Sequence, residues 1–239
     1  MVRSRGSEEV SDLKCISAGF TLVEMLLVLA VLATLAAILI PAVGSVRSHA
    51  LLAECSSNQR QIGLALKLYA NDNKGIYPPS THSTGPFRRD RSWIFALNQY
   101  FTNKIDEIRV CPVDPPERQK QVLDRGATSY VLNDLVFDDP QYHVQHWIPE
   151  PSRTLLLFIL SEDRPPSLTN DHIHGGEWTN WYAALNDIEP DRHRSGKRSA
   201  DRTKGSAPYL FADGHVEVIE AADFKSRFDR GENPAEVPF

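Results

Sequence analysis

The feature that most constrains this chain is an apolar stretch near its N-terminus. From Phe20 to Val43 the sequence reads FTLVEMLLVLAVLATLAAILIPAV, and Glu24 is the only charged residue in it. A helix needs about 20 apolar residues to cross a bilayer core, so residues 20–43 are expected to form one membrane-spanning helix. A buried helix of a soluble protein is the less favoured alternative. Pro41 is expected to kink this helix near its far end.

The residues before this stretch form a polar segment. Residues 1–19 carry charges of both signs and contain no apolar run of their own. An ordinary secretory signal places its small residues after the apolar region, but here Ser17, Ala18 and Gly19 come before it. This order distinguishes residues 1–19 from an ordinary secretory signal.

A helical period continues after the apolar stretch, over residues 44–75. Apolar side chains recur there at three- and four-residue steps, as on one face of an amphipathic helix. They are Val43, Val46, Ala50, Ala53, Cys55, Ile62, Ala65, Leu66 and Tyr69. The polar run 71–74, with Gly75 in a left-handed cap, predicts the end of the helix. We therefore expect one long helix whose first half lies in lipid and whose second half packs on a domain.

The remaining residues, 76–239, predict a small globular domain with strands. The runs 129–137, 154–160 and 209–219 are rich in β-branched or aromatic residues and are bounded by turn residues, which is typical of strands. Residues 92–101 predict a short helix. A long helix followed by strands favours an α+β fold in which the helix packs on a small antiparallel sheet.

The residues around the start of the apolar stretch resemble the processing site of type IV prepilins and type II secretion pseudopilins. The resemblance rests on Gly19, Phe20, Glu24, the apolar run and Pro41. It implies a pilin-like fold, with leader 1–19 removed by a prepilin peptidase after Gly19 and the new amino terminus of Phe20 methylated. It further implies a single-pass inner membrane protein with a cytoplasmic leader and a periplasmic C-terminal domain, or a place in a cell-surface filament.

Glu24 is the residue of this pattern that needs a physical explanation. A carboxylate within hydrocarbon is costly and requires a partner. The favoured partner is the Phe20 amine of a neighbouring subunit, because a charge pair offsets part of the desolvation cost of each ion. The alternative is a Glu24 side chain that reaches the nearby membrane interface.

A second resemblance covers parts of the remaining chain. The segments 55–72, 111–112, 129–133 and 209–217 are similar to prepilin-type proteins with the His-x9-Asp-Gly domain. This chain departs from that pattern, because nineteen residues separate His193 from Asp213, as though residues 194–203 were inserted. A joint role for His193 and Asp213 is therefore in doubt.

The cysteines are expected to pair once the leader is removed. Cys15 would leave with the leader, so Cys55 and Cys111 would remain. A domain outside the cytoplasm is in an oxidising compartment, and we predict a disulfide between them. Two unpaired buried thiols are the alternative.

The Asp213-Gly214 pair predicts a tight turn between two strands, because glycine tolerates positive φ and aspartate bonds to nearby backbone. A calcium site like those of major pseudopilins, with Asp213 and neighbouring carbonyl oxygens as ligands, is the alternative. No other cofactor is expected. Two histidine pairs have spacings that zinc could use, but no cysteine pair lies near them, so no metal site is predicted. They are His172 with His174 and His143 with His146.

These observations favour a structural subunit, a pseudopilin or minor pilin. The expected partners are the prepilin peptidase, other pilin or pseudopilin subunits and the inner membrane. The net charge of −5 argues against a nucleic-acid partner, and no nucleophile elbow, phosphate loop or HExxH motif indicates an enzyme. The alternative is an adhesive or DNA-uptake minor pilin that binds a ligand through residues 192–204 and 177–182. Residues 192–204 are otherwise interpreted as a solvated basic loop.

Overall fold

The computed structural model describes residues 21–81, 92–102 and 104–239. The chain divides into two compact units, one ending at Val46 and the other running from Arg47 to Phe239. The predicted leader 1–19, including Gly19, lies outside the described residues, and so does Phe20.

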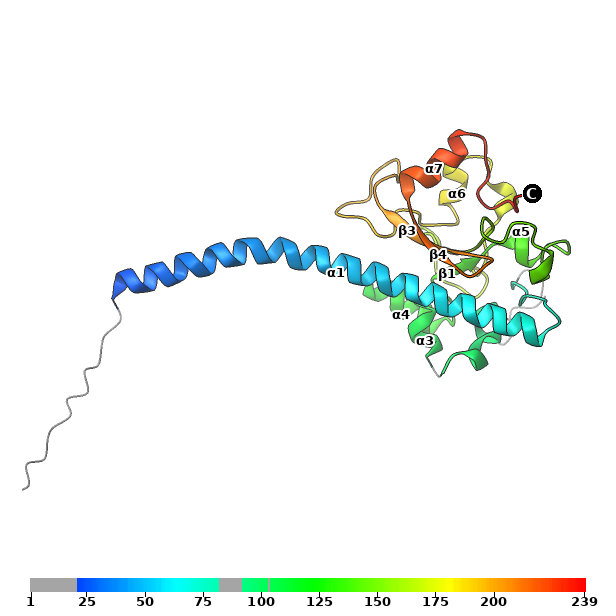
Figure 1. Cartoon of the computed structure of the whole chain (residues 1–239), viewed down its shortest axis with the longest axis horizontal. Coiled ribbons are helices and arrows are strands. Elements are labelled where there is room, and N and C mark those ends of the chain that lie inside the picture. Colours follow the sequence, from blue (N-terminus) through cyan, green and yellow to red (C-terminus); the bar gives the residue numbers. More distant parts are fainter. Residues whose placement is uncertain (1–20, 82–91, 103) are drawn as a thin grey trace, which may run out of the picture. The chain divides into compact units, whose positions relative to one another are not determined.

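One long helix precedes several short helices and a four-stranded sheet (Figure 1). The α-helices are α1 (Leu22–Asp72), α2 (Trp93–Ala96), α3 (Ile105–Ile108), α4 (Pro116–Asp124), α5 (Asp134–Phe137), α6 (Trp181–Leu185) and α7 (Ala221–Asp229). The strands are β1 (Tyr130–Leu132), β2 (Leu155–Ile159), β3 (Ser206–Phe211) and β4 (Val216–Glu220). Short 3-10 turns are η2 (Asn98–Tyr100), η3 (Gln145–Trp147) and η4 (Gly175–Glu177).

The predicted long helix is confirmed as α1. It extends over 51 residues and is continuous across Pro41, while the kink expected at Pro41 stays a prediction. Its C-terminal end has the predicted left-handed cap, because Gly75 has φ +84° and its N–H donates to the Ala70 carbonyl oxygen at 2.7 Å.

The two halves of α1 differ in exposure. Every side chain from Thr21 to Ile40 is exposed, whereas one face is buried from Cys55 to Ala70. The amphipathic face was expected to begin earlier, but Val46 is 68% exposed, and Ala50 and Ala53 are exposed as well. That part of the expectation is wrong, because only from Cys55 onward is this face buried by the domain.

The sheet confirms the α+β fold class. Its strand order is β1-β2-β3-β4 and all neighbouring strands are antiparallel. Strands β2 and β4 match the predicted runs, whereas β3 begins at Ser206, three residues before the predicted start at Tyr209. The run 129–137 is only partly a strand: the Asn133 side chain accepts from the Leu135 N–H and so caps α5, which turns the chain into a helix.

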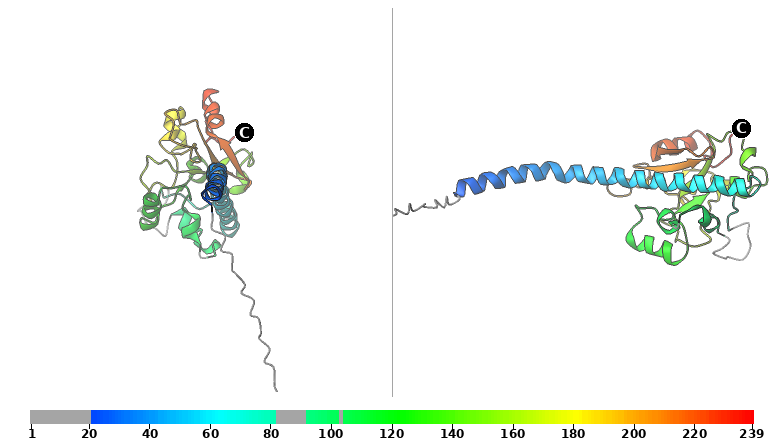
Figure 2. Two further views of the ribbon diagram at one scale, coloured as in Figure 1. Left: turned by 90° about the vertical axis from the view of Figure 1, so that its left-hand side faces the viewer. Right: turned by 60° about the horizontal axis from the view of Figure 1, so that its bottom comes forward.

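Strand β3 is buried on both of its faces. On one face Leu210 contacts α1 at Gly63, where an added Cβ would lie 2.7 Å from the Leu210 Cδ1. On the other face Tyr209 stacks on Phe224 of α7, with ring centroids 4.8 Å apart. In the two views of Figure 2, as in Figure 1, α7 and the β3–β4 hairpin lie on one side of the second half of α1, and α3 and α4 lie on the other.

The tryptophans of segment 177–182 belong to the core. Trp178 and Trp181 are each 3% exposed, and their indole N–H groups donate to Asp187 Oδ2 and to the Asp201 carbonyl oxygen, both at 2.9 Å. The interpretation of this segment as a ligand surface is therefore wrong for both tryptophans.

Candidate assembly helix and the contacts that support it

The first half of α1 presents an apolar surface with no protein against it. In the described ranges, α1 is the one helix long and apolar enough to cross a membrane by its length and composition. Burying apolar surface gains about 25 cal/mol per Å², so a helix apolar on all sides is stable only in lipid or among other apolar helices. The segment can therefore serve as a transmembrane or signal-anchor helix.

The N-terminus of α1 is capped by a reciprocal pair of hydrogen bonds between Thr21 and Glu24. The Thr21 N–H donates to Glu24 Oε2 at 2.8 Å, and the Glu24 N–H donates to Thr21 Oγ1 at 3.2 Å. The Thr21 hydroxyl also donates to Glu24 Oε2, at 2.7 Å. This is a capping box, which satisfies two backbone N–H groups that the helix itself leaves unpaired.

Glu24 thus has a partner within its own chain, which our sequence analysis missed. The signal was present, because Thr21-Leu-Val-Glu24 has the Thr-x-x-Glu spacing of a capping box. The residues that precede Thr21 lie outside the described ranges, so pairing of Glu24 with a Phe20 amine stays a prediction.

The structure brings the two remaining cysteines together. The Cys55 and Cys111 sulfur atoms lie 3.8 Å apart, both fully buried, and both are free thiols. The Tyr130 hydroxyl lies 3.5 Å from the Cys55 sulfur, and burial raises the pKa of the Cys55 thiol well above its usual range. The predicted disulfide therefore requires only a local approach of two neighbouring sulfur atoms, and it stays a prediction.

Asp213 and Gly214 form the predicted turn between β3 and β4. Gly214 has φ +93°, and its N–H donates to the Phe211 carbonyl oxygen at 2.9 Å. Asp213 Oδ1 accepts from the His215 N–H at 3.0 Å.

The same turn offers little to a calcium ion. The Lys67 ammonium group, from α1, donates to the Asp213 carbonyl oxygen, which places a positive charge beside the expected oxygen ligands. Nowhere in residues 21–81, 92–102 or 104–239 do three His, Cys, Asp or Glu side chains gather as a metal site would require. The turn therefore has a structural role through its own hydrogen bonds, and calcium binding there stays a prediction.

His193 and Asp213 lie at opposite ends of β3. The His193 N–H donates to the Ser206 carbonyl oxygen at 2.9 Å at the start of the strand, and Asp213 follows its other end. The six residues of β3 span roughly 17 Å, and Asp213 lies two residues beyond them, so the two side chains share no site. Burial, together with the nearby Arg192, lowers the pKa of His193 to about 4, which keeps the imidazole neutral at pH 7.

The arginines of residues 192–204 form a cluster of ion pairs with carboxylates from other segments, and this cluster is called the ion cage below. Arg192 is buried and donates to both Asp114 and Glu162. The other three arginines also have carboxylate partners: Arg194 with Glu162 at 3.0 Å, Arg198 with Asp163 at 2.6 Å, and Arg202 with Asp191 at 2.6 Å. The interpretation of this segment as a solvated loop is wrong for Arg192 and Arg202, which are buried, while Lys197 and Lys204 are exposed as expected.

This cage could not be read from the sequence. Its carboxylates come from three separate segments, at Asp114, at 162–163 and at 189–191. Their charges meet only after folding. Because the cage neutralises these four arginines, residues 192–204 present less positive charge to an anionic ligand than their composition indicates.

The chain matches no protein-family model, no curated protein and no solved structure. Its function is therefore inferred from the geometry of its own residues.

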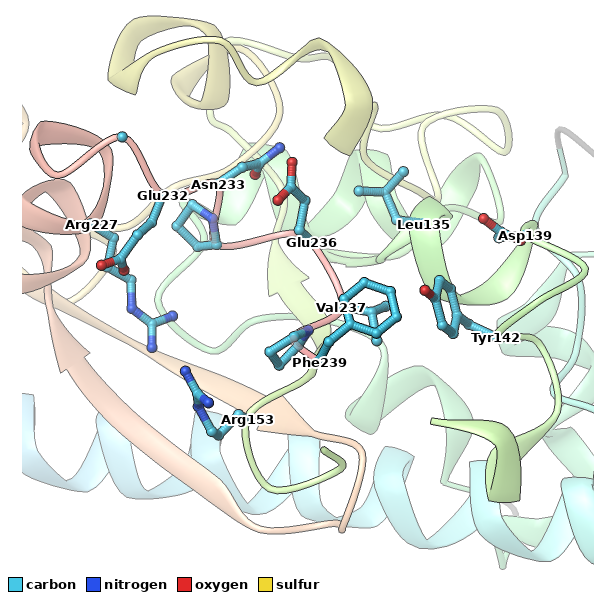
Figure 3. A pocket seen from close by; sticks show the side chains of 13 residues that line it. Leu135, Asp139, Tyr142, Arg153, Arg227, Glu232, Asn233, Glu236, Val237 and Phe239 are labelled. Carbon is cyan, nitrogen blue, oxygen red and sulfur yellow. The ribbon is translucent and has the colours of Figure 1, made fainter. Parts of the chain in front are cut away.

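A hollow of about 540 Å³ lies under the C-terminal segment (Figure 3). It is lined by Arg153, Arg227, Leu135, Tyr142 and residues of the segment 231–239. No motif in the sequence indicated it, because its walls come from parts of the chain that are distant in sequence.

We predict that the Cys55–Cys111 disulfide forms in the native protein and stabilises it. A crosslink between residues 56 positions apart stabilises by about 4 kcal/mol in the chain-entropy model. Free-thiol titration should find no reactive thiol until reductant is added, and reduction should lower the free energy of unfolding. The matched control is Cys111→Ala, whose unfolding should not respond to reductant. Equal thiol counts before and after reduction would contradict this prediction.

We predict that Arg192→Gln destabilises the domain by about 3 kcal/mol or more, because Asp114 would remain buried without its main cationic partner. Urea unfolding of the full chain in detergent measures this loss. Lys197→Gln is the control in the same segment, and its exposed side chain predicts a change within about 0.5 kcal/mol. Similar unfolding midpoints for the two variants would show that the cage contributes little.

Proposed function

We propose that this chain is a structural subunit, a pseudopilin or minor pilin, of a type IV pilus-like or type II secretion filament. The observation that carries the proposal is an apolar helical segment with exposed side chains throughout, which begins at the capping box of Thr21 and Glu24, directly after the Gly19-Phe20 pair. A prepilin peptidase would remove residues 1–19 and leave Phe20 as the first residue.

The apolar surface supports assembly on physical grounds. The segment Met25–Ile40 is exposed throughout. In lipid this exposure costs no hydrophobic free energy, because the surrounding lipid chains are also apolar. A subunit that leaves the bilayer must replace lipid with other apolar surface, and copies of the same helix supply it. A filament whose centre consists of such helices meets this requirement.

The described contacts of the domain support a structural role. The residues of the second resemblance act as structural contacts: Cys55 touches Cys111, the Asn133 side chain donates to the Ala235 carbonyl oxygen at 2.8 Å, and Asp213 shapes a turn. The adhesive or DNA-uptake alternative relied on residues 177–182 and 192–204. Since the tryptophans and arginines there bond within the domain, no observation favours that alternative.

The first test is the N-terminus of the native protein. Mass spectrometry should find Phe20 as the first residue, N-methylated, because small Gly19 suits a peptidase that cuts beside it. Gly19→Leu should leave residues 1–19 attached while membrane insertion continues, since the span is unchanged. Ser4→Leu, within the leader but far from the cut, should be processed normally. A native protein that begins at Met1 would overturn the assignment.

The second test separates the charge of Glu24 from its capping role. Glu24→Gln keeps an oxygen that can accept from the Thr21 N–H, since glutamine also serves in capping boxes, but it removes the negative charge. We expect normal expression, cleavage and insertion, and loss of incorporation into wild-type filaments. Co-purification measures incorporation, and the methylation state of the same sample is checked by mass spectrometry.

Two control variants make this test decisive. Thr34→Val changes a polar residue of the span whose hydroxyl donates only to the Val31 carbonyl oxygen, at 2.8 Å, and should assemble normally. Glu24→Ala removes charge and cap together and should lose about 1 kcal/mol of helix stability in addition. If a cleaved and methylated Glu24→Gln subunit still incorporates, apolar packing drives assembly and the intersubunit charge pair is wrong.

A further inference from the structure

The hollow under the C-terminal segment has a charged end and an apolar end. In Figure 3 the guanidinium groups of Arg153 and Arg227 point toward the same end of it, while Tyr142 and Phe239 lie toward the other. Its volume of about 540 Å³ falls in the range of small-molecule sites. No residue of α1 lines it, so its role is separate from assembly through that helix.

Arg227 is the residue that most needs a partner. It is half-buried on the last turn of α7, and its side chain forms no ion pair within the described ranges. Glu232 is close enough to interact with Arg227 electrostatically, but its two oxygens accept hydrogen bonds from Arg230 Nε and Nη2 at 2.8 and 3.2 Å. A half-buried guanidinium group therefore faces the hollow with no direct ion pair in the described ranges.

Arg153 adds a second cation at the same end. Its Nη1 donates to Glu150 Oε2 at 2.6 Å, and among the described residues its other N–H groups have no hydrogen-bond acceptor. Both Arg227 and Arg153 help Arg230 to lower the pKa of Glu232, so both guanidinium groups lie close enough to act on an anion at this end. A guanidinium group can bind a carboxylate through two parallel N–H donors.

The far end suits an apolar group. The Tyr142 and Phe239 rings have centroids 6.2 Å apart, and Leu135 and the buried Val237 complete the wall. Such a surface attracts an aromatic or aliphatic side chain in proportion to the area it covers.

The acidic residues that line the hollow restrict the negative charge that a bound ligand can carry. Asp139, Glu232 and Glu236 also line the hollow, and Asp139 Oδ1 accepts from the Gln141 N–H at 2.7 Å. Two cations beside three carboxylates leave no excess of positive charge for a doubly charged phosphate. A monoanion that contacts the two arginines meets less repulsion from these carboxylates than a dianion does.

We propose that this hollow binds an apolar carboxylate, with the carboxylate held by Arg153 and Arg227 and the apolar group against Tyr142 and Phe239. Such a ligand is either a small organic acid or the C-terminal residue of a polypeptide. The two sources share the chemistry that the hollow recognises.

The test uses the full-length chain in lipid nanodiscs, with N-acetylphenylalanine as the probe. Equilibrium dialysis should show saturable binding above that of empty nanodiscs, which account for partition of the probe into lipid. N-acetylphenylalaninamide, which lacks the carboxylate, should not bind. Arg227→Gln should weaken binding about tenfold, because it removes charge-assisted hydrogen bonds, and Arg60→Gln on the exposed side of α1 should not change it.

A fold check, a second variant and a pair of peptides complete the test and identify the source of the ligand. Circular dichroism verifies the fold of each variant, and Arg153→Gln, at a largely exposed side chain, gives a second variant that should also weaken binding. A peptide ending in a free phenylalanine carboxylate is compared with its amidated form. Binding of the free peptide assigns a polypeptide C-terminus, and binding of the acid alone assigns a small molecule. Equal binding of acid and amide, or no effect of either arginine variant, would overturn the proposal.

Discussion

Burial of one face of α1 against β3 is the interaction on which the rest of the domain depends. Gly63 lets Leu210 approach the helix, and the Gln59 side chain donates to the Pro208 carbonyl oxygen at 2.8 Å inside that interface. The opposite face of β3 then packs on the aromatic rings that join the sheet to α7. A strand covered on both sides fixes the layers of the domain, because helix α1 and helix α7 can each contact only one of its faces.

The ion cage performs a different task from this apolar packing. Buried ion pairs recover little net free energy, because desolvation of each charge opposes their attraction. Arg192 nevertheless joins Asp114, which follows Cys111, to Glu162 after β2. The cage therefore specifies how the segments after α3 and after β2 meet, while the hydrophobic core supplies most of the stabilisation.

The start of α1 combines two demands on one carboxylate. Within the chain, Glu24 completes a capping box with Thr21 and so satisfies backbone donors that hydrocarbon would leave unpaired. In the proposed filament the same carboxylate also forms an ion pair with the N-terminal amine of a neighbouring subunit. A carboxylate has enough lone pairs to accept from several donors, so Glu24 can take part in the cap and in the intersubunit pair at the same time. Only the intersubunit pair requires its negative charge.

The sequence by itself determined the features that depend on local order: the apolar run of α1, its end at Gly75, the strands β2 to β4 and the turn at Asp213-Gly214. It also contained the Thr21–Glu24 capping box, which we overlooked because Glu24 was considered only as a membrane charge. Tertiary structure alone decided the rest. Arg192 and Trp178 looked like surface residues until carboxylates and aromatic rings from distant segments enclosed them, and the hollow beside Arg227 exists only where those segments meet. Composition records which groups a segment carries, but burial and pairing depend on neighbours that only the fold brings together.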